Sequence, residues 1–235
     1  ALRATPMSPP SWWQTTVEAG RRHNIWVAVL GTYVELALDD EPRRTANAAD
    51  FKSQLAVCKA LGAGCIGTET TNMALQPAGT SRERAQYLLC KSLETILPEA
   101  ERLGVTVGIE PVSYHSMNTP EATRRILDTM ASPALKVIFD AGNLLTADAV
   151  TRQDDLWERV GSLLGDRIVA VHFKGETFGP DGAPRSSSLE DSVIDFDGAF
   201  RMLRSLPQTL PVLREEAVPE RAASDIALIR CHFEG

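Results

Sequence analysis

The feature that most constrains this sequence is a regular alternation of strand-like and helix-like segments. Short apolar runs rich in β-branched residues are each followed by a longer segment whose apolar residues recur near a 3.6-residue period. Nearly continuous apolar strands separated by helices are typical of a parallel sheet covered by helices. We expect six strands, at residues 25–30, 65–70, 105–112, 135–141, 167–174 and 211–217.

Helices are expected between these strands, at residues 15–23, 50–61, 81–103, 120–130, 152–164, 195–206 and about 220–232. Pro98 lies inside the longest of these segments and predicts a kink or a break, because proline removes a helical hydrogen bond. Residues 175–194 are rich in Gly, Pro and Ser and predict a loop of about 20 residues, a length typical of lids and binding loops.

Two architectures share this pattern, an open doubly wound sheet and a (β/α)8 TIM barrel. In an open sheet the ligand site gathers at one switch point, whereas all strands of a barrel end at one mouth. The sequence has no GxGxxG motif after its first strand, and ionisable residues recur at the C-terminal ends of successive strands. We therefore predict that residues 1–235 form a single TIM-barrel domain.

A TIM barrel has eight strands, and only six are expected here. The chain is therefore expected to lack the first βα unit and most of the second strand, with residues 1–3 as the tail of that strand. Exposed sheet edges invite pairing with another chain. We predict either a longer parent polypeptide or an assembly, such as a homo-oligomer, that covers the gap.

Charge and composition exclude several classes of protein. The chain carries 24 basic and 31 acidic side chains, a net charge of −7 that disfavours a nucleic-acid partner. No apolar run approaches the roughly 18 residues that a membrane span needs, and no signal peptide is evident. The four cysteines form no CxxC pair and are predicted to be reduced and buried. We expect a soluble cytoplasmic protein with no membrane partner.

Four ionisable residues each close an apolar strand, and consecutive ones lie one strand–helix unit apart. They are Glu110, Asp140, His172 and Glu215. A single acid after a strand is commonly a helix cap or a salt-bridge partner. Three carboxylates gathered at one barrel mouth, however, require a counter-charge. The set predicts one divalent metal ion, Mn²⁺ or Mg²⁺ before Zn²⁺ or Co²⁺.

Four further residues near the predicted mouth are candidate substrate-binding residues: Glu69, His115, Asn143 and Lys174. Lys174 follows His172 by two residues and therefore shares its strand face, where its charge can hold an enolate or a phosphate. His115 lies in the loop after Glu110, where an imidazole can bind a hydroxyl or serve as an acid. A solvated loop histidine and an exposed strand-end lysine are the simpler alternatives.

Several segments resemble one known family. GIEPVSYH, VIFDAGNLL, VAVHFK and VLREE, together with CIGTET, are similar to segments of the xylose-isomerase-like superfamily of barrels, most closely the sugar phosphate isomerases/epimerases. The resemblance extends from about residue 25 to residue 217. It implies that Glu110, Asp140, His172 and Glu215 bind one divalent metal ion. It also implies that Glu110 and Glu215 flank the substrate carbon whose proton is moved.

This resemblance implies an isomerase or epimerase of carbohydrate metabolism that moves a proton beside a carbonyl through an enediolate. Its substrate would be a small sugar, a sugar phosphate or an inositol derivative. Asn143 stands where ketohexose epimerases usually have a histidine, and Gly175 where an aspartate usually follows the HxK segment, with Glu176 next. The choice of Glu215 over Glu216 rests on the resemblance.

Three alternatives accompany this interpretation. An inosose-type dehydratase of the same superfamily would use the same metal and base but expel a hydroxyl. A non-catalytic binding protein could keep the barrel without the reaction. An apurinic endonuclease is disfavoured, because it would need additional metal ligands and a basic groove, whereas this chain has four histidines and a net charge of −7.

Overall fold

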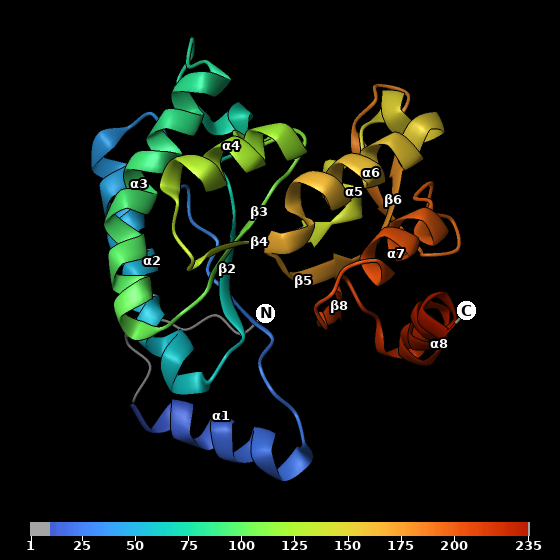
Figure 1. Ribbon diagram of the computed structural model, residues 1–235, viewed down its shortest axis with the longest axis horizontal. Helices are drawn as coiled ribbons and strands as arrows, with labels where there is room; N and C mark the ends of the chain where they lie inside the picture. Colours follow the sequence, from blue (N-terminus) through green and yellow to red (C-terminus); the bar gives the residue numbers. More distant parts are fainter. Residues whose placement is uncertain (1–9, 235) are drawn as a thin grey trace.

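A parallel sheet of six strands forms the centre of the molecule in the computed structural model, which describes residues 10–234 (Figure 1). The strands are β1 (Val29–Gly31), β2 (Cys65–Glu69), β3 (Val107–Glu110), β4 (Leu135–Asp140), β5 (Ile168–Phe173) and β8 (Val212–Arg214). Their order in the sheet follows the chain, and each neighbouring pair is parallel. The six expected strands are present, several of them shorter than expected.

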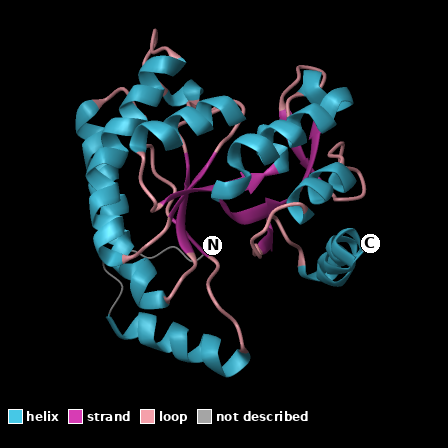
Figure 2. Ribbon diagram, viewed as in Figure 1, coloured by secondary structure: helices cyan, strands magenta, loops and turns pink. Residues whose placement is uncertain are grey.

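Helices follow the strands and cover the sheet (Figure 2). They are α1 (Pro10–His23), α2 (Glu41–Leu61), α3 (Arg82–Leu103), α4 (Pro120–Met130), α5 (Ala141–Leu144), α6 (Gln153–Leu164), α7 (Phe196–Arg204) and α8 (Ala222–Glu234). The side chains of Asp40, Ser81 and Thr119 each accept a hydrogen bond at the start of a helix. Gly62 and Gly104 end α2 and α3 in the left-handed conformation that glycine adopts without strain.

Three local expectations are wrong. Helix α2 begins at Glu41 rather than at residue 50, because Asp40 caps it and its first half is too polar to show an apolar period. Pro98 does not break α3, whose buried neighbours Leu97 and Ala100 pack that turn onto the core. The expected long loop contains an antiparallel hairpin of β6 (Gly175–Phe178) and β7 (Pro184–Ser187), joined by a turn through Gly179 and Gly182.

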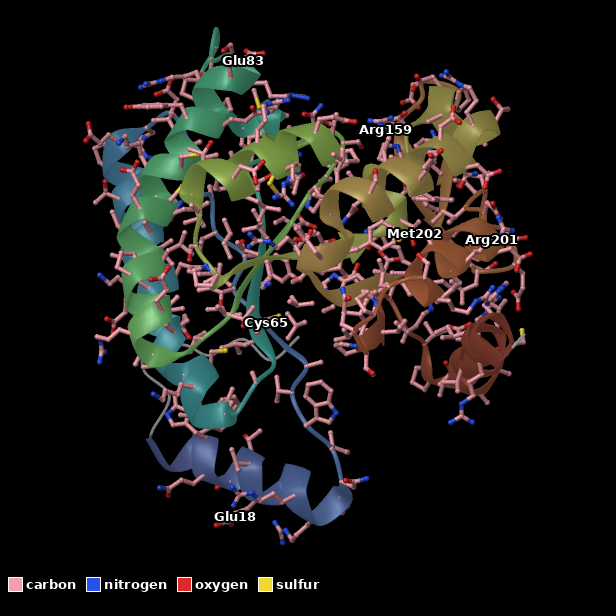
Figure 3. All side chains as sticks on the ribbon, viewed as in Figure 1. Glu18, Cys65, Glu83, Arg159, Arg201 and Met202 are labelled. Atoms are coloured by element: carbon pink, nitrogen blue, oxygen red, sulfur yellow. The ribbon has the colours of Figure 1, made fainter. Side chains whose placement is uncertain are left out.

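Two apolar clusters pack on opposite faces of the sheet. The larger lies between the sheet and the helices and includes Val137 and Phe139 of β4. The smaller contains Cys65, Ile138 and Ala170 from β2, β4 and β5. Figure 3 shows Cys65 in the interior, with charged residues of the outer helices at the periphery. The alternation along β4 therefore separates the interior of the half-barrel from its helical layer.

Glycines let the central strands approach the smaller cluster. A Cβ atom on Gly67 would lie 2.6 Å from Ile138 Cδ1, and one on Gly108 would lie 2.8 Å from Ile138 Cγ1. The Ile138 side chain therefore occupies the space that side chains on β2 and β3 would otherwise fill. This packing fixes β2, β3 and β4 relative to one another below the ends that carry ionisable residues.

Three further expectations concern the N-terminal residues, the cysteines and membrane-spanning helices. Residues 1–3, expected to end an earlier strand, lie outside the described residues. Cys58 and Cys65 are buried as expected, whereas Cys90 is half-buried and Cys231 is exposed, because both lie on helices at the surface. None of the described helices is long and apolar enough to cross a membrane.

Candidate active site

The strand ends bring the four predicted metal ligands to one end of the sheet. Glu110 is the last residue of β3 and Asp140 the last residue of β4. His172 lies beside Asp140 in the register of β4 and β5. Glu215 directly follows β8, the partner of β5. Because all these strands are parallel, their C-terminal ends meet at the same edge.

Three of the four side chains form a compact buried group. Glu110, Asp140 and His172 each offer a ligand atom within 4.8 Å of the others. The three residues are at most 5% exposed. Glu215 is not part of this group, but its Oε1 lies 3.0 Å from His172 Nδ1, the same distance as Glu110 Oε2. His172 therefore stands between the two glutamates.

The chemistry of these residues fits a divalent cation. Asp140 Oδ2 and His172 Nδ1 are buried and make no hydrogen bond among the described residues; their close contacts are ion pairs with Lys174 and with the two glutamates. Buried carboxylates gathered in this way require a positive counter-charge. Carboxylate oxygens and an imidazole nitrogen are ligands of Mn²⁺, Mg²⁺ and Zn²⁺. Glu110, Asp140 and His172 would hold the ion, with Glu215 beside them.

The electrostatics of the cluster show an excess of negative charge. Burial raises the pKa of Asp140, and the charges of Glu110 and Glu215 raise it further, although Lys174 opposes them. Burial disfavours the charged imidazole of His172, yet the two glutamates outweigh it and raise its pKa to about 10. The site therefore retains protons unless a cation compensates the carboxylates.

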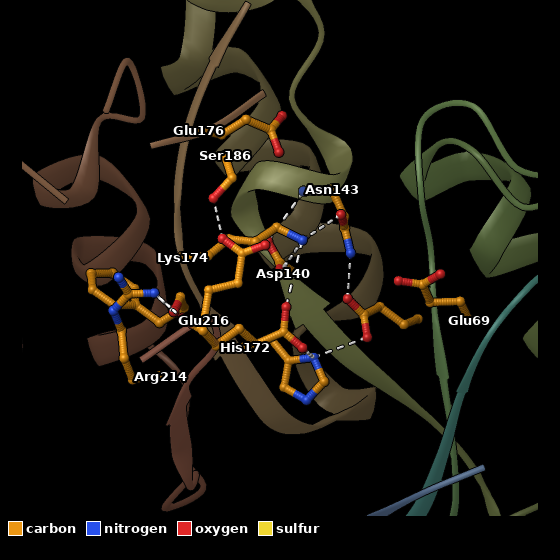
Figure 4. A network of polar contacts seen from close by, with 12 residues as sticks. Glu69, Asp140, Asn143, His172, Lys174, Glu176, Ser186, Arg214 and Glu216 are labelled. Atoms are coloured by element: carbon orange, nitrogen blue, oxygen red, sulfur yellow. Dashed lines mark hydrogen bonds and ion pairs between the residues drawn. The ribbon is translucent and has the colours of Figure 1, made fainter. Parts of the chain in front are cut away.

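Asn143 and Lys174, two predicted substrate-binding residues, join the same network (Figure 4). Asn143 Nδ2 donates a hydrogen bond of 2.5 Å to Glu110 Oε1. Lys174 Nζ donates one of 2.7 Å to Asn143 Oδ1. The same ammonium lies 3.3 Å from Asp140 Oδ2 and 3.5 Å from Glu215 Oε2. Both residues thus contact the predicted metal ligands directly.

Glu69 and His115 form a separate pair. Glu69 ends β2 opposite Glu110 in the strand register, and its Oε2 lies 4.0 Å from His115 Nε2. Burial raises the pKa of Glu69 to about 7, and burial lowers the pKa of His115 to about 4. Among the described residues, no hydrogen bond or ion pair links either side chain to Asp140 or His172.

Two residues near the site were not predicted from the sequence to be functional. Tyr33 follows β1 and, with His172 and Glu215, lines a pocket of about 500 Å³ between β1 and β8. Burial raises its pKa, and the carboxylates of the site raise it further. Glu176 in β6 is buried with Oε1 unpartnered, and burial raises its pKa to about 7. Of these two residues, only Glu176 could have been identified from the sequence, by its position just after the HxK segment.

The structure also distinguishes two adjacent glutamates. Glu215 contacts His172 and Lys174, whereas Glu216 accepts a hydrogen bond from Ser186 of the hairpin. Glu216 has a φ of 53°, so the chain turns sharply there. Because of this turn the two carboxylates point to different partners, and Glu215 lies beside the group of Glu110, Asp140 and His172.

The parallel strands form a half-barrel with carboxylates and one imidazole at its C-terminal edge, which is the arrangement of a TIM-barrel-like protein with a candidate metal site. The family model described as "Xylose isomerase-like TIM barrel" matches residues 3–230. The chain therefore belongs to this family, which confirms the predicted family and fold class. A comparison of the sequence with curated proteins finds no match.

Solved structures share the fold at low sequence identity. A D-tagatose 3-epimerase-like protein is 16% identical, with a TM-score of 0.78 over 96% of this chain and 84% of that one. The IOLI protein with a bound zinc atom is 18% identical, with a TM-score of 0.76 over 94% and 80%. Mannonate dehydratase from Streptococcus suis is 13% identical, with a TM-score of 0.75 over 99% and 85%. The matched structures thus include epimerase-like and dehydratase proteins.

Proposed function

We propose that this protein is a divalent-metal-dependent isomerase or epimerase that moves a proton beside the carbonyl of a small sugar, a sugar phosphate or an inositol derivative. The observation that carries the proposal is the position of Glu110 and Glu215, each with an oxygen 3.0 Å from His172 Nδ1. Two carboxylates that approach one point from different strands can remove and return a proton. Family membership and the epimerase-like structural neighbour support this reaction class.

Each residue of the cluster has a part in this proposal. The metal ion, when bound by Glu110, Asp140, His172 and Glu215, supplies positive charge beside substrate oxygens on which negative charge develops. Glu110 and Glu215 are the acid/base pair. Burial raises the pKa of Glu215, but contacts with His172 and then with Lys174, 3.5 Å from its Oε2, outweigh burial and lower it, so the carboxylate is ionised and can accept a proton.

Glu215 is the better placed of the two glutamates to meet a substrate. Its side chain is 30% exposed, whereas that of Glu110 is 2% exposed. It also lines the pocket between β1 and β8 together with Tyr33. Glu69 and His115, which pair at the neighbouring strand end, are proposed as contacts to substrate hydroxyl groups.

A dehydratase is the second candidate, because its reaction begins with the same proton removal. One neighbour in fold is a mannonate dehydratase. The raised pKa of Glu69, about 7, gives the site a carboxyl group that can donate a proton to a departing hydroxyl. The two activities differ in product, since a dehydratase releases water and an epimerase conserves the mass of its substrate.

Proton exchange with solvent tests the proposal. The Mn²⁺-loaded protein is incubated in D₂O with D-fructose, D-tagatose, D-fructose 6-phosphate and 2-keto-myo-inositol, and the C–H signals beside the carbonyl are followed by proton NMR. The expected result is loss of such a signal for at least one compound, and none with Glu215→Gln. A product lighter by one water would favour the dehydratase. No exchange with any compound, while metal is bound, would favour a binding protein instead.

A further inference from the structure

A directional chain of hydrogen bonds runs into the metal site. Lys174 Nζ donates to Asn143 Oδ1 at 2.7 Å, and Asn143 Nδ2 donates to Glu110 Oε1 at 2.5 Å (Figure 4). An ammonium group can only donate, and an ionised carboxylate can only accept. The amide of Asn143 therefore has one orientation that satisfies both neighbours, with its oxygen toward the lysine and its nitrogen toward the glutamate.

The backbone of Asn143 is fixed as firmly as its side chain. Its N–H donates to Asp140 Oδ1 at 3.1 Å, which caps the short helix α5. Its carbonyl oxygen accepts a hydrogen bond of 2.7 Å from the N–H of Ser113. The residue is 5% exposed. Both ends of its amide therefore have partners within the site, and the substrate contact that the sequence suggested for Asn143 stays a prediction.

These two hydrogen bonds orient the carboxylate of Glu110. Its Oε1 is held by the amide, which leaves Oε2 directed toward His172 Nδ1 at 3.0 Å. Glu215 shows the contrast, because the contacts of its carboxylate are to His172 and Lys174 and its side chain is 30% exposed. Of the two glutamates, Glu110 is thus the more buried one and the one whose carboxylate accepts a hydrogen bond from a buried amide.

We propose that Asn143 is a positioning residue for the metal site: it holds Glu110 so that one oxygen faces the cation, and Lys174 sets the direction of its amide. This inference rests on the metal site of the proposed function but goes beyond it, because it concerns how the site is held before any substrate binds. Outer-shell hydrogen bonds of this kind orient ligands and typically change metal affinity by about 10–100-fold.

Manganese affinity tests the proposal without any substrate. Titration calorimetry with MnCl₂ is carried out on the wild type and on Asn143→Leu, which keeps the branched shape of the side chain but cannot hydrogen-bond. Gln153→Leu is the matched control, because Gln153 is a buried amide that bonds Val150, Val193 and Asp195 instead of the cluster. We expect Asn143→Leu to weaken Mn²⁺ binding about 10–100-fold and the control to stay within about twofold of the wild type.

The visible absorption of the Co²⁺-loaded protein is the second readout, since a residue with a merely structural role would not change the ligand field. It should change in Asn143→Leu and in Lys174→Met and stay unchanged in Gln153→Leu. Asn143→Ser is measured in parallel, so that the test does not depend on the leucine variant folding. Wild-type affinity and spectrum in the Asn143 variants would overturn the proposal and leave the proposed function intact. A wild type that binds no Mn²⁺ would overturn both.

Discussion

The interior strands β3, β4 and β5 differ from the edge strand β8 in how they present side chains. Within the described residues each interior strand is paired on both sides, whereas β8 is paired only with β5. The ends of β3, β4 and β5 carry Glu110, Asp140 and His172, which are almost fully buried. The three residues of β8 are only half-buried, and the Glu215 side chain that follows them is 30% exposed.

This difference suggests a division of labour within the site. A ligand at the end of an interior strand is held by strand register and by the packing beneath it, so it can keep a fixed position around a metal ion. A carboxylate beyond an edge strand has fewer restraints and opens onto the pocket beside Tyr33. The interior strands are thus suited to coordination, and Glu215 beyond the edge strand is the more accessible member of the acid/base pair.

The largest expected effect is on proton exchange, in variants that separate metal binding from proton transfer. Glu215→Gln should retain bound metal, because Glu110, Asp140 and His172 still hold the ion and the amide oxygen of the glutamine can replace the carboxylate oxygen. It should slow proton exchange about 10³-fold, because a positioned general base contributes a factor of this order. Asp140→Asn should lose both metal and exchange. The two variants are compared by elemental mass spectrometry and by the NMR exchange assay. Equal loss of metal in both would contradict the division between edge and interior.

A smaller effect is expected on stability. Ile138→Ala, in the buried interior cluster, should lower the free energy of unfolding by about 3 kcal/mol, because the space it leaves between β2 and β3 cannot close. Leu213→Ala on the edge strand should cost about 1 kcal/mol, since that side chain is half-buried. Chemical denaturation of the metal-free proteins measures both. A larger cost at Leu213 would reverse the comparison.

The smallest effect concerns pH. In the metal-free protein the pKa of His172 rises from 6.5 to about 10, because the attraction of Glu110 and Glu215 outweighs burial. The stability from this raised pKa is fully present below pH 6.5 and is lost as pH rises through about 10. Calorimetry in EDTA should show that the Tm advantage of the wild type over His172→Gln, a few degrees or about 1 kcal/mol, shrinks across this window. A constant difference would contradict the pairing.

The sequence predicted the interior of the molecule better than its edges. Glu110, Asp140 and His172 each close an apolar strand, and the parallel register brings them together without any further information. The strand expected at residues 25–30 is instead Val29–Gly31, because Ile25 and Trp26 are exposed before it. Edge strands bury less surface, so apolar runs there locate the ends of strands poorly.

Other features needed three-dimensional contacts that no local pattern reveals. The hairpin β6–β7 resembled a loop because its second strand, with Pro184 and successive serines, has little strand propensity. The link from Lys174 through Asn143 to Glu110 joins residues more than 30 positions apart in the sequence. Sequence spacing placed these three side chains near one mouth but could not show which of them bond.

The central claim is that Glu110, Asp140 and His172 bind a metal ion. Its most direct test is the metal content of the purified wild type, Glu110→Ala and His172→Ala by elemental mass spectrometry, after incubation with Mn²⁺ and dialysis. The account predicts about one divalent ion per chain in the wild type and none in either variant. A wild type that folds normally by circular dichroism and holds no metal, or variants that retain the ion, would contradict it.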